Sequence, residues 1–414
     1  MESFIESVDF FKGNNIEDIA QKYGTPLYVY SEEIIRDRMH KVANVITKYP
    51  YRANYSIKAN SNFQILKLAL SEGVNCDAMS EGEMRMLLAA GFPAEQIFFV
   101  SNNIDAKEMQ FAIDNNIMIS LDSLDQLRLF GSINRGGKCA VRLNPGVGVG
   151  HHEKVVTAGK KTKFAIQEDD IDEIFKIAKE YDLTICGINQ HAGSLFMDPA
   201  PYLAAVDNFL RLALKFPNLE FIDFGGGYGI PYHKLDDEAP FDMEGFSKEL
   251  EKRIDKFVEE YGSAPLFKSE PGRFCVAEGS VLLGRVNSIK NNVDKKFVGT
   301  DVGMNVLVRP SMYDSHHDIE IIRNGQVVKG EKEPVTVCGN ICESGDVLCK
   351  DRPLPKAQDN DLIAVLDSGA YGYSMCSSYN NRFRPAEVMV MKDGSVKLVR
   401  RRETFEDLMR FFEV

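Results

Sequence analysis

The chain has 414 residues, 44% of them hydrophobic, which is enough for two domains with complete cores. Its formal net charge of −12 argues against nucleic acid or an anionic membrane as a partner. No apolar run approaches the length of a membrane span, and residues 1–6 lack the basic and apolar character of a signal peptide. We therefore expect a cytoplasmic protein.

The sequence alternates short β-rich runs with helical-period segments from about residue 50 to 275. Eight β/α units in roughly 225 residues match the size of a (β/α)8, TIM-like barrel. A doubly wound sheet is the alternative, but no Gly-x-Gly-x-x-Gly opens the first unit. The expected strands are 53–58, 74–78, 97–100, 117–121, 139–143, 184–189, 219–224 and 266–270. Helical patterns lie between most of them, for example at 62–72, 80–90, 105–115, 168–181, 201–215 and 243–261.

The texture of the sequence changes after residue 280, where short β-branched runs are separated by Gly, Asn and Asp. Asn324-Gly325 and Asp393-Gly394 are hairpin signals. We expect an all-β domain, a sandwich or barrel, that ends in a helix near 403–412. The expected strands are 281–289, 296–300, 335–338, 362–366 and 386–391. We place the barrel domain at 34–280 and the β-rich domain at 281–414 together with 1–33; the run 27–30 fits either domain.

The eight cysteines show no CxxC pair and no Cys/His cluster. This pattern indicates neither a disulfide framework nor a zinc site, so we expect reduced thiols, most of them in the core. His316 and His317 are adjacent, but no third ligand has a plausible spacing. We therefore expect no metal site.

Reactive residue types fall at six of the eight expected strand ends, where barrels of this class carry their chemistry. An amine at such a position, once buried, can lose its proton and form an imine with a carbonyl. An isolated strand-end lysine would more often extend its amine to solvent. The coincidence over six strands favours a reactive site. The residues are Lys58, Asp77, Arg142 with Asn144, His191, the glycines 225–227, and Glu270.

The triple glycine 225–227 allows the backbone to approach an anion and point amide N–H groups at it. It follows the seventh strand, and phosphate sites in such barrels are often built after strands seven and eight. Ser194 could add a hydroxyl to the same phosphate. Glu270 is either a structural partner of Arg273 or, beside a phosphate site, the group that keeps a proton on the pyridine nitrogen of pyridoxal 5'-phosphate (PLP).

Further polar segments of the β-rich domain could carry chemistry. Cys342-Glu-Ser-Gly-Asp346 is too polar for a strand interior, and on composition alone it would be a surface turn. Asp367-Ser-Gly-Ala-Tyr371 is a loop that bears an aromatic hydroxyl, and Arg309-Pro-Ser-Met-Tyr313 adds a guanidinium. His191 is either a core histidine or a side chain that lies against a cofactor ring.

Taken together, the motifs resemble those of the fold type III (alanine-racemase-like) PLP enzymes and, within them, the diaminopimelate decarboxylase family. The resemblance runs from Thr25-Pro-Leu-Tyr-Val-Tyr30 to Arg401-Arg-Glu-Thr404. The lysine, glycine and Glu270-Pro-Gly-Arg273 motifs are typical of the broad decarboxylase group. The Arg309 and Cys342 motifs resemble the diaminopimelate branch. Two departures, at Asn189 and in the loop 314–318, leave fine specificity open.

The resemblance implies a role for each matching residue. Lys58 would hold PLP covalently, Glu270 would face the pyridine nitrogen, and Cys342 would be the general acid, entering the site from the partner subunit of a homodimer. The resemblance implies that the cofactor contacts are made by Lys58, Asp77, His191, Ser194, Gly226, Gly227, Glu270, Gly272, Arg273 and Tyr371. The substrate contacts it implies are Arg273, Arg309, Tyr313, Glu343 and Tyr371, and the catalytic groups are Lys58, His191, Glu270 and Cys342.

The pair Arg309 and Glu343 points to one substrate. A guanidinium pairs bidentately with a carboxylate, and a carboxylate pairs with an ammonium group. The distal end of meso-diaminopimelate carries both groups, whereas ornithine or lysine would leave Arg309 unpaired. We expect decarboxylation of meso-2,6-diaminopimelate to L-lysine, with a decarboxylase of another basic amino acid as the alternative. A non-catalytic PLP-binding protein and a racemase rank lower, because the former can lack a β domain and the latter would need a tyrosine base.

Overall fold

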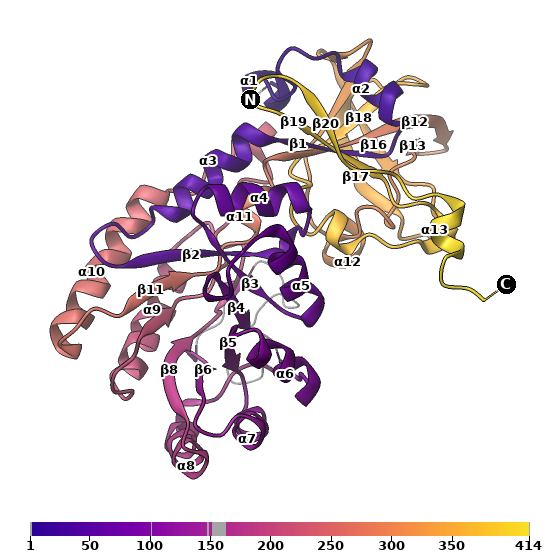
Figure 1. Cartoon of the computed structure of the whole chain (residues 1–414). Helices are drawn as coiled ribbons and strands as arrows, with labels where there is room; N and C mark the ends of the chain where they lie inside the picture. Colours follow the sequence, from indigo (N-terminus) through magenta and orange to yellow (C-terminus); the bar gives the residue numbers. More distant parts are fainter. Residues whose placement is uncertain (1, 101, 147–148, 151–162, 414) are drawn as a thin grey trace. The chain divides into compact units, whose positions relative to one another are not determined.

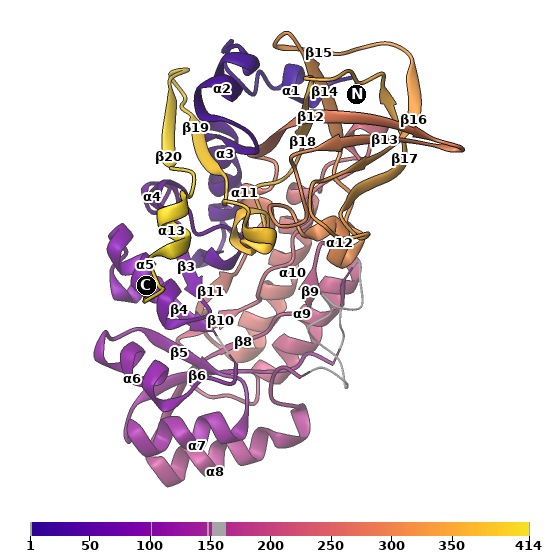
Figure 2. The same ribbon diagram turned by 90° about the vertical axis from the view of Figure 1, so that its right-hand side faces the viewer.

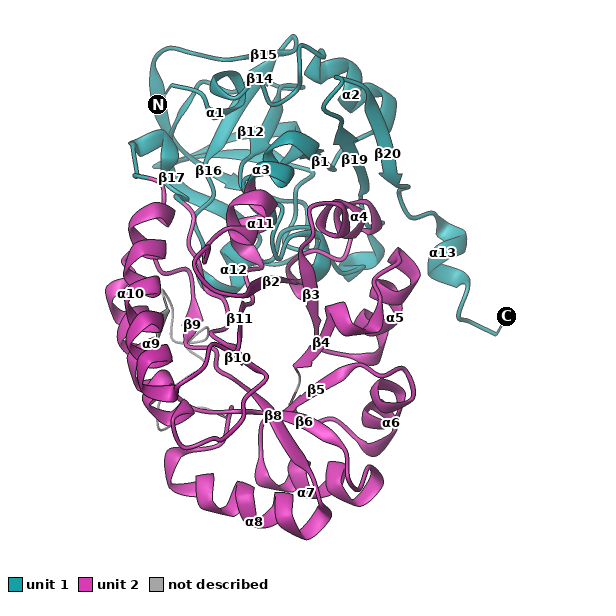
Figure 3. Ribbon diagram, turned by 60° about the vertical axis from the view of Figure 1, so that its left-hand side comes forward, with its two compact units in different colours: residues 1–37, 231–239, 276–414 teal, residues 38–230, 240–275 magenta. Residues whose placement is uncertain are grey.

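The structure, a computed structural model, describes residues 2–100, 102–146, 149–150 and 163–413. The chain divides into two compact units, coloured separately in Figure 3. Unit 1 comprises Met1–Asp37, Pro231–Ala239 and Val276–Val414, and unit 2 comprises Arg38–Ile230 and Pro240–Cys275. We expected the division at 34–280 against 281–414 with 1–33. The boundaries differ by four and five residues, and the segment 231–239, which we had placed in the barrel, belongs to unit 1.

Unit 2 is a closed barrel of eight parallel strands (Figure 1). The order around the barrel is β2 (Tyr51–Ser56), β3 (Asn75–Ala78), β4 (Ile97–Val100), β5 (Met118–Leu121), β6 (Lys138–Arg142), β8 (Thr184–Asn189), β10 (Phe221–Asp223) and β11 (Leu266–Ser269). All eight expected strands are present, within two residues at every end, and the doubly wound alternative is wrong. Closure brings β11 beside β2, with Phe267 opposite Tyr51.

Helices follow most of the barrel strands: α4 (Phe63–Ser71), α5 (Glu81–Ala90), α6 (Ala106–Asp114), α7 (Leu124–Ile133), α8 (Ile171–Tyr181), α9 (Ala200–Ala213) and α10 (Met243–Tyr261). Side chains that accept backbone N–H groups begin several of them, as Ser80 does for α5 and Asp105 for α6. Helices α7 and α8 run side by side (Figures 1 and 2), and a Cβ on Gly131 would lie 2.5 Å from the ring of Tyr181. Close helix packing therefore requires glycine at position 131.

The inside of the barrel changes from apolar to polar along the strands. Phe98, Cys186 and Phe221 form a buried apolar cluster, in which the two phenylalanine rings meet edge to face at 5.3 Å. Two residues further along β10 the side chain is Asp223, and β8 ends in Asn189; both are fully buried. Because side chains of a strand alternate between faces, residues two apart point the same way. A polar layer thus lies at the carboxyl ends of the strands, next to the apolar cluster.

Unit 1 is built on a ten-stranded sheet with the path β15–β14–β18–β12–β1–β19–β20, extended by β13, β16 and β17. The strands are β1 (Leu27–Ser31), β12 (Ser280–Asn292), β13 (Lys295–Thr300), β14 (Ile319–Arg323), β15 (Gln326–Val327), β16 (Lys332–Cys338), β17 (Val347–Pro355), β18 (Leu362–Val365), β19 (Ala386–Val390) and β20 (Val396–Arg400). Strand β1, whose sequence fits either domain and which we placed with the β-rich domain, lies between β12 and β19 in this sheet. Both hairpin signals are confirmed, since β14–β15 and β19–β20 are antiparallel pairs.

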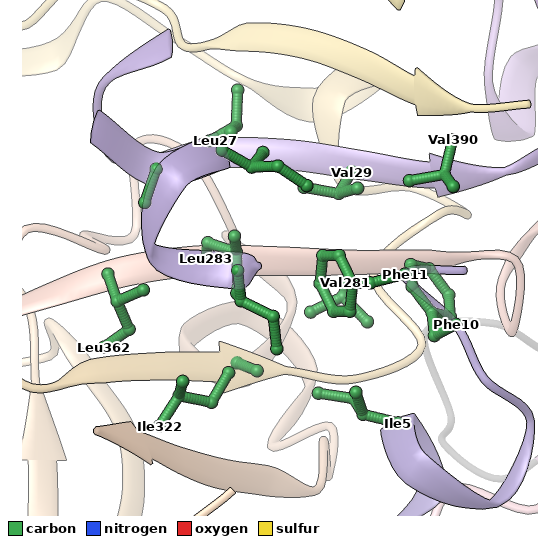
Figure 4. Close-up of a cluster of buried hydrophobic side chains, with 14 of the residues drawn as sticks. Ile5, Phe10, Phe11, Leu27, Val29, Val281, Leu283, Ile322, Leu362 and Val390 are labelled. Carbon is green, nitrogen blue, oxygen red and sulfur yellow. The ribbon is translucent and has the colours of Figure 1, made fainter. Parts of the chain in front are cut away.

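One face of this sheet carries a continuous apolar core (Figure 4). Leu27 and Val29 of β1 and Val281 and Leu283 of β12 alternate with side chains on the other face, and all four are fully buried. The N-terminal segment covers this core with Phe10 and its neighbour Phe11. Burial of each such side chain contributes about 1.5–3 kcal/mol to folding.

Shorter elements complete the units. In unit 1 these are α1 (Phe4–Ser7), α2 (Ile16–Tyr23), α12 (Arg309–Tyr313) and α13 (Phe405–Met409), and in unit 2 a two-stranded sheet of β7 (Val149–Gly150) and β9 (Gly193–Ser194). Helices α3 (Glu32–Ala43) and α11 (Arg273–Val276) cross the boundaries. Among the described residues, no helix combines the length and the apolar character needed to cross a bilayer.

Candidate active site

Lys58 lies in a single 3-10 turn, Ile57–Ala59, that follows β2 directly. We expected it to be the last residue of the strand; the strand ends two residues earlier, at Ser56. The hydroxyl of Tyr55 donates to the Asn60 carbonyl at 2.7 Å and so holds the turn closed. Lys58 is therefore fixed at the carboxyl end of the barrel.

Two carboxylates in the barrel mouth interact electrostatically with Lys58. Burial raises the pKa of Asp77 to about 7, against the opposing effects of Lys58 and of the Ser56 hydroxyl, which donates to Asp77 Oδ2 at 3.0 Å. Burial also raises the pKa of Glu270 well above its usual range, and the negative charges of Asp223 and Asp77 raise it further. This end of the barrel therefore concentrates buried acids around one lysine.

His191 follows β8 and faces the same group of charges. Burial lowers the pKa of His191, and the positive charges of Lys58 and Arg142 lower it further. Its Nδ1 accepts the Gly226 N–H at 3.3 Å, so the ring is neutral with its hydrogen on Nε2. A neutral, oriented imidazole is suited to lie against a flat ring.

The triple glycine packs tightly against its neighbours. A Cβ on Gly225 would lie 2.2 Å from the Gln190 carbonyl oxygen, and one on Gly226 would lie 2.0 Å from that of Glu270. Gly227 has φ +114° and approaches the Gly193 carbonyl, so only glycine fits there. The loop after the seventh strand therefore brings bare backbone to the barrel mouth.

Ser194, Arg273 and Gly272 lie at this end of the barrel as well. Arg273 Nη2 donates to Ser194 Oγ at 3.0 Å, which joins the sixth and eighth strand ends. A Cβ on Gly272 would meet Ser56 at 2.9 Å, so the Glu270–Arg273 turn packs closely on the end of β2. Unit 2 thus brings together Lys58, Asp77, His191, Ser194, Gly226, Gly227, Glu270, Gly272 and Arg273.

Several buried polar atoms at the barrel mouth have no hydrogen-bond partner among the described residues. They include Glu270 Oε1, Asp77 Oδ1, Arg142 Nε, Asn189 Nδ2 and both amide atoms of Gln190. Buried polar groups are normally paired, so such a concentration marks a place for a polar ligand. A ring with a protonated nitrogen, polar substituents and a phosphate, as in PLP, fits these donors and acceptors.

The remaining candidate residues belong to unit 1. Arg309 and Tyr313 begin and end α12, and Arg309 is buried. The Ser311 hydroxyl donates to the Gly345 carbonyl at 2.7 Å and ties α12 to the turn 342–346. In that turn Cys342 and Glu343 are exposed, and Tyr379 donates to the Glu343 carboxylate.

Asp346 fixes the turn that carries Cys342. Its carboxylate accepts the backbone N–H groups of Met304 at 2.6 Å and Ile341 at 2.7 Å. Tyr371 lies in a loop in which both Asp367 and Tyr371 have a positive φ, near +57°. Such a backbone is costly for residues other than glycine and persists only where the surroundings determine it.

Two polar residues of the barrel interior were missed from the sequence as candidates. Asp223 ends β10, accepts the Gly225 N–H at 2.9 Å and has its pKa raised by burial to about 6. Lys268 lies opposite it in β11, with its ammonium 3.9 Å from the centre of the Phe221 ring. The available signal was a charged residue inside a run otherwise suited to a buried strand.

A closed parallel barrel with a lysine, buried acids and a glycine loop at its strand ends is the architecture of a PLP-dependent enzyme of fold type III. The family model for "Pyridoxal-dependent decarboxylase, pyridoxal binding domain" matches residues 32–277, more than half of the chain. The diaminopimelate decarboxylase of Methanothermobacter thermautotrophicus is 40% identical over 407 residues, which cover 96% of this chain and 94% of that protein. The chain belongs to the diaminopimelate decarboxylase family.

Solved structures agree with this assignment. Diaminopimelate decarboxylase from Helicobacter pylori, solved in complex with L-lysine, superposes with a TM-score of 0.87 at 30% identity and covers 96% of this chain and 98% of its own. The lysine/ornithine decarboxylase of Vibrio vulnificus has a TM-score of 0.78 at 21% identity, covering 92% of this chain and 98% of its own. The second comparison shows a shared fold alone.

Proposed function

We propose that this protein is a PLP-dependent decarboxylase that converts meso-2,6-diaminopimelate to L-lysine and CO2. The observation that carries the proposal is the full-length similarity to curated diaminopimelate decarboxylases at 33–40% identity. The barrel supplies the groups for the cofactor, and unit 1 supplies the groups that choose the substrate.

Lys58 would hold PLP through its amine, and the buried Glu270 Oε1 would accept the hydrogen of the pyridine nitrogen. When bound, PLP supplies an electron sink that stabilises the negative charge left at the carbon when CO2 departs. His191 would lie against the ring, and Asp77 would complete the polar surroundings of Lys58. The phosphate ligands would be Ser194, Gly226, Gly227, Gly272, Arg273 and Tyr371.

Arg309 and Glu343 would select the distal end of the substrate. The planar guanidinium of Arg309 matches a carboxylate, and the Glu343 carboxylate matches an ammonium group. An amino-acid end satisfies both, whereas a bare amine offers no carboxylate to the guanidinium of Arg309 and so forgoes that interaction. Arg273, Tyr313 and Tyr371 would complete the substrate contacts.

Cys342 would deliver the proton that replaces CO2 on the substrate carbon. Its Sγ must lose that proton to carbon and regain one from solvent in each cycle. Exposure of Cys342 and Glu343 on the described chain supports a homodimer in which each chain contributes these residues to its partner's site.

The state of the thiols supports the expected cytoplasmic location. All eight cysteines are unpaired, and five are buried. Such cysteines are typical of proteins kept in a reducing compartment.

The test is CO2 release by the purified holoenzyme from meso-diaminopimelate, L-lysine, L-ornithine and L-arginine. We expect release from meso-diaminopimelate with equimolar L-lysine, and little from the others. Preference for ornithine or lysine would overturn the role of Arg309 and favour the alternative decarboxylase. Absence of release from every substrate would overturn the decarboxylase assignment.

A further inference from the structure

Arg309, the proposed ligand of the substrate carboxylate, is itself held by two side chains of unit 1. Its Nη1 donates to His317 Nε2 at 2.7 Å, and its Nη2 donates to Ser315 Oγ at 3.2 Å. Arginine has no acceptor atom, so the direction of both hydrogen bonds is fixed. All three side chains are buried.

The other nitrogen of His317 determines the protonation state of the ring. Nδ1 lies 2.8 Å from the carbonyl oxygen of Leu366, which can only accept. Nδ1 therefore carries the hydrogen, and Nε2 is the acceptor for the guanidinium of Arg309. The ring is neutral, and a proton on Nε2 would place a second cation directly against the guanidinium.

The surroundings hold the His317 ring in one orientation. The centre of the Tyr232 ring lies 5.3 Å from that of the His317 ring, with the two rings edge to face. The centre of the Tyr232 ring also lies 5.0 Å from the guanidinium carbon of Arg309. Arg352 Nη1 donates to the His317 backbone carbonyl at 2.7 Å. The contact with Tyr232 and the hydrogen bond to the His317 backbone thus hold the imidazole in place.

Leu366 connects this arrangement to the loop that bears Tyr371. It directly precedes Asp367, the first residue of the loop 367–371, and its N–H donates to the Asp318 carbonyl at 2.9 Å. His317 therefore joins the guanidinium of Arg309 to the chain that leads into a proposed phosphate contact.

We propose that His317 is a positioning residue that sets the orientation of Arg309 toward the distal carboxylate of the substrate. The proposal rests on the role given to Arg309 in the proposed function. A misoriented Arg309 would lose a hydrogen bond to the substrate carboxylate. A hydrogen bond to a charged group contributes about 1.5–3 kcal/mol, so substrate binding should weaken roughly 10- to 100-fold.

The test compares two amides at position 317. The side chain of His317→Gln can place an acceptor near the position of Nε2, whereas His317→Asn is too short to reach Arg309 and keeps only a donor for Leu366. We expect His317→Asn to raise KM for meso-diaminopimelate roughly 10- to 100-fold with a smaller change in kcat. His317→Gln should recover most of that loss, and His40→Asn, the same change at an exposed histidine, should behave as the unaltered enzyme.

Two inhibitors separate positioning of Arg309 from general damage. L-lysine keeps the distal carboxylate, and 1,5-diaminopentane lacks any carboxylate. In His317→Asn the inhibition constant of L-lysine should rise in step with KM, while that of 1,5-diaminopentane and the cofactor absorbance stay unchanged. Equal weakening of both inhibitors, or unchanged L-lysine inhibition, would overturn the proposal.

A second variant covers failure of His317→Asn to fold. Ser315→Ala removes the other hydrogen bond to Arg309 and should show the same selective weakening of L-lysine, to a smaller extent; unchanged inhibition by L-lysine would contradict the proposal. If the unaltered enzyme itself forms no L-lysine from meso-diaminopimelate, the proposed function fails. Normal activity with an insensitive His317→Asn would refute only the positioning role.

Discussion

The two units differ in whether their buried charged groups have hydrogen-bond partners. In unit 1 the ammonium of Lys234 is buried and contacts Asp367 Oδ1 at 2.6 Å, Glu278 Oε1 at 3.1 Å and the ring of Phe4 at 4.1 Å. In unit 2 the buried Glu270 has an oxygen with no hydrogen-bond partner among the described residues.

The difference separates a structural charge cluster from a binding site. In the Lys234 cluster one Asp367 oxygen lacks a described partner, but its other oxygen and the ammonium are paired. At the barrel mouth the unpaired atoms come from several strand ends at once. Each costs about 1–3 kcal/mol while it stays unpaired, and a ligand that pairs them recovers that cost on binding.

The largest effect should come from Lys58→Ala. Loss of the amine removes the covalent attachment of PLP, so decarboxylation should fall by roughly 10³-fold or more. The measurement is CO2 release together with the absorbance of bound cofactor. Lys268→Met, which removes the other lysine of the barrel interior, should keep the absorbance; if it is lost there and retained in Lys58→Ala, the assignment is wrong.

Cys342→Ala tests the proton donor of unit 1. We expect kcat to drop by about 10²–10⁴, the range for loss of a general acid, while PLP stays bound. Cys338→Ala, a change at a half-buried thiol outside the site, should retain full activity. Normal turnover of Cys342→Ala would refute its role.

Lys234→Met should disrupt the Lys234 cluster of unit 1. Removing one partner leaves Glu278 and Asp367 buried without their cation, so the free energy of unfolding should fall by about 3–5 kcal/mol. Lys248→Met removes an exposed lysine that pairs with Glu244 on α10 and should leave the denaturation midpoint unchanged. Equal stability of the two variants would contradict the structural role of the cluster.

The buried acids of the barrel predict the smallest effect, a dependence of apoprotein stability on pH. The pKa of Asp77 is about 7 in the folded protein and near 3.9 in an unfolded chain, so the folded state binds more protons between these values. Stability should therefore fall as pH rises from about 5 to 7, and Asp77→Asn should flatten that slope.

Urea denaturation of the apoprotein at several pH values measures this slope. Hydrogen bonds from Lys48 and Tyr49 lower the pKa of the half-buried Asp255, so its charge is constant in this window. Asp255→Asn is thus a suitable control. An unchanged slope in Asp77→Asn would show that burial does not raise the pKa of this acid.

The barrel could be predicted from the sequence because its strands are short apolar runs of regular spacing, and their ends then indicated Lys58, His191 and Glu270. Strand β17 was harder to predict, since its sequence has a polar middle and two prolines. Within the described part of the chain, β17 pairs with β16 alone, and an edge strand tolerates this composition.

Specific side-chain contacts could not be predicted from the sequence. The hydrogen bond from Arg309 to His317 depends on how the loop after α12 folds back, and the sequence shows only a nearby histidine. The burial of Asp223 and Lys268 depends on closure of the barrel. It could not be predicted, because periodicity indicates which face of a strand a side chain lies on but not which strands are its neighbours.

The most direct test of the account is to reduce the holoenzyme with borohydride, which makes the bond between lysine and cofactor permanent, and to map the labelled peptide by mass spectrometry. The account predicts the pyridoxyl group on Lys58, at the carboxyl end of β2, and on no other lysine. Label on Lys268 or Lys234 with Lys58 unmodified would contradict it.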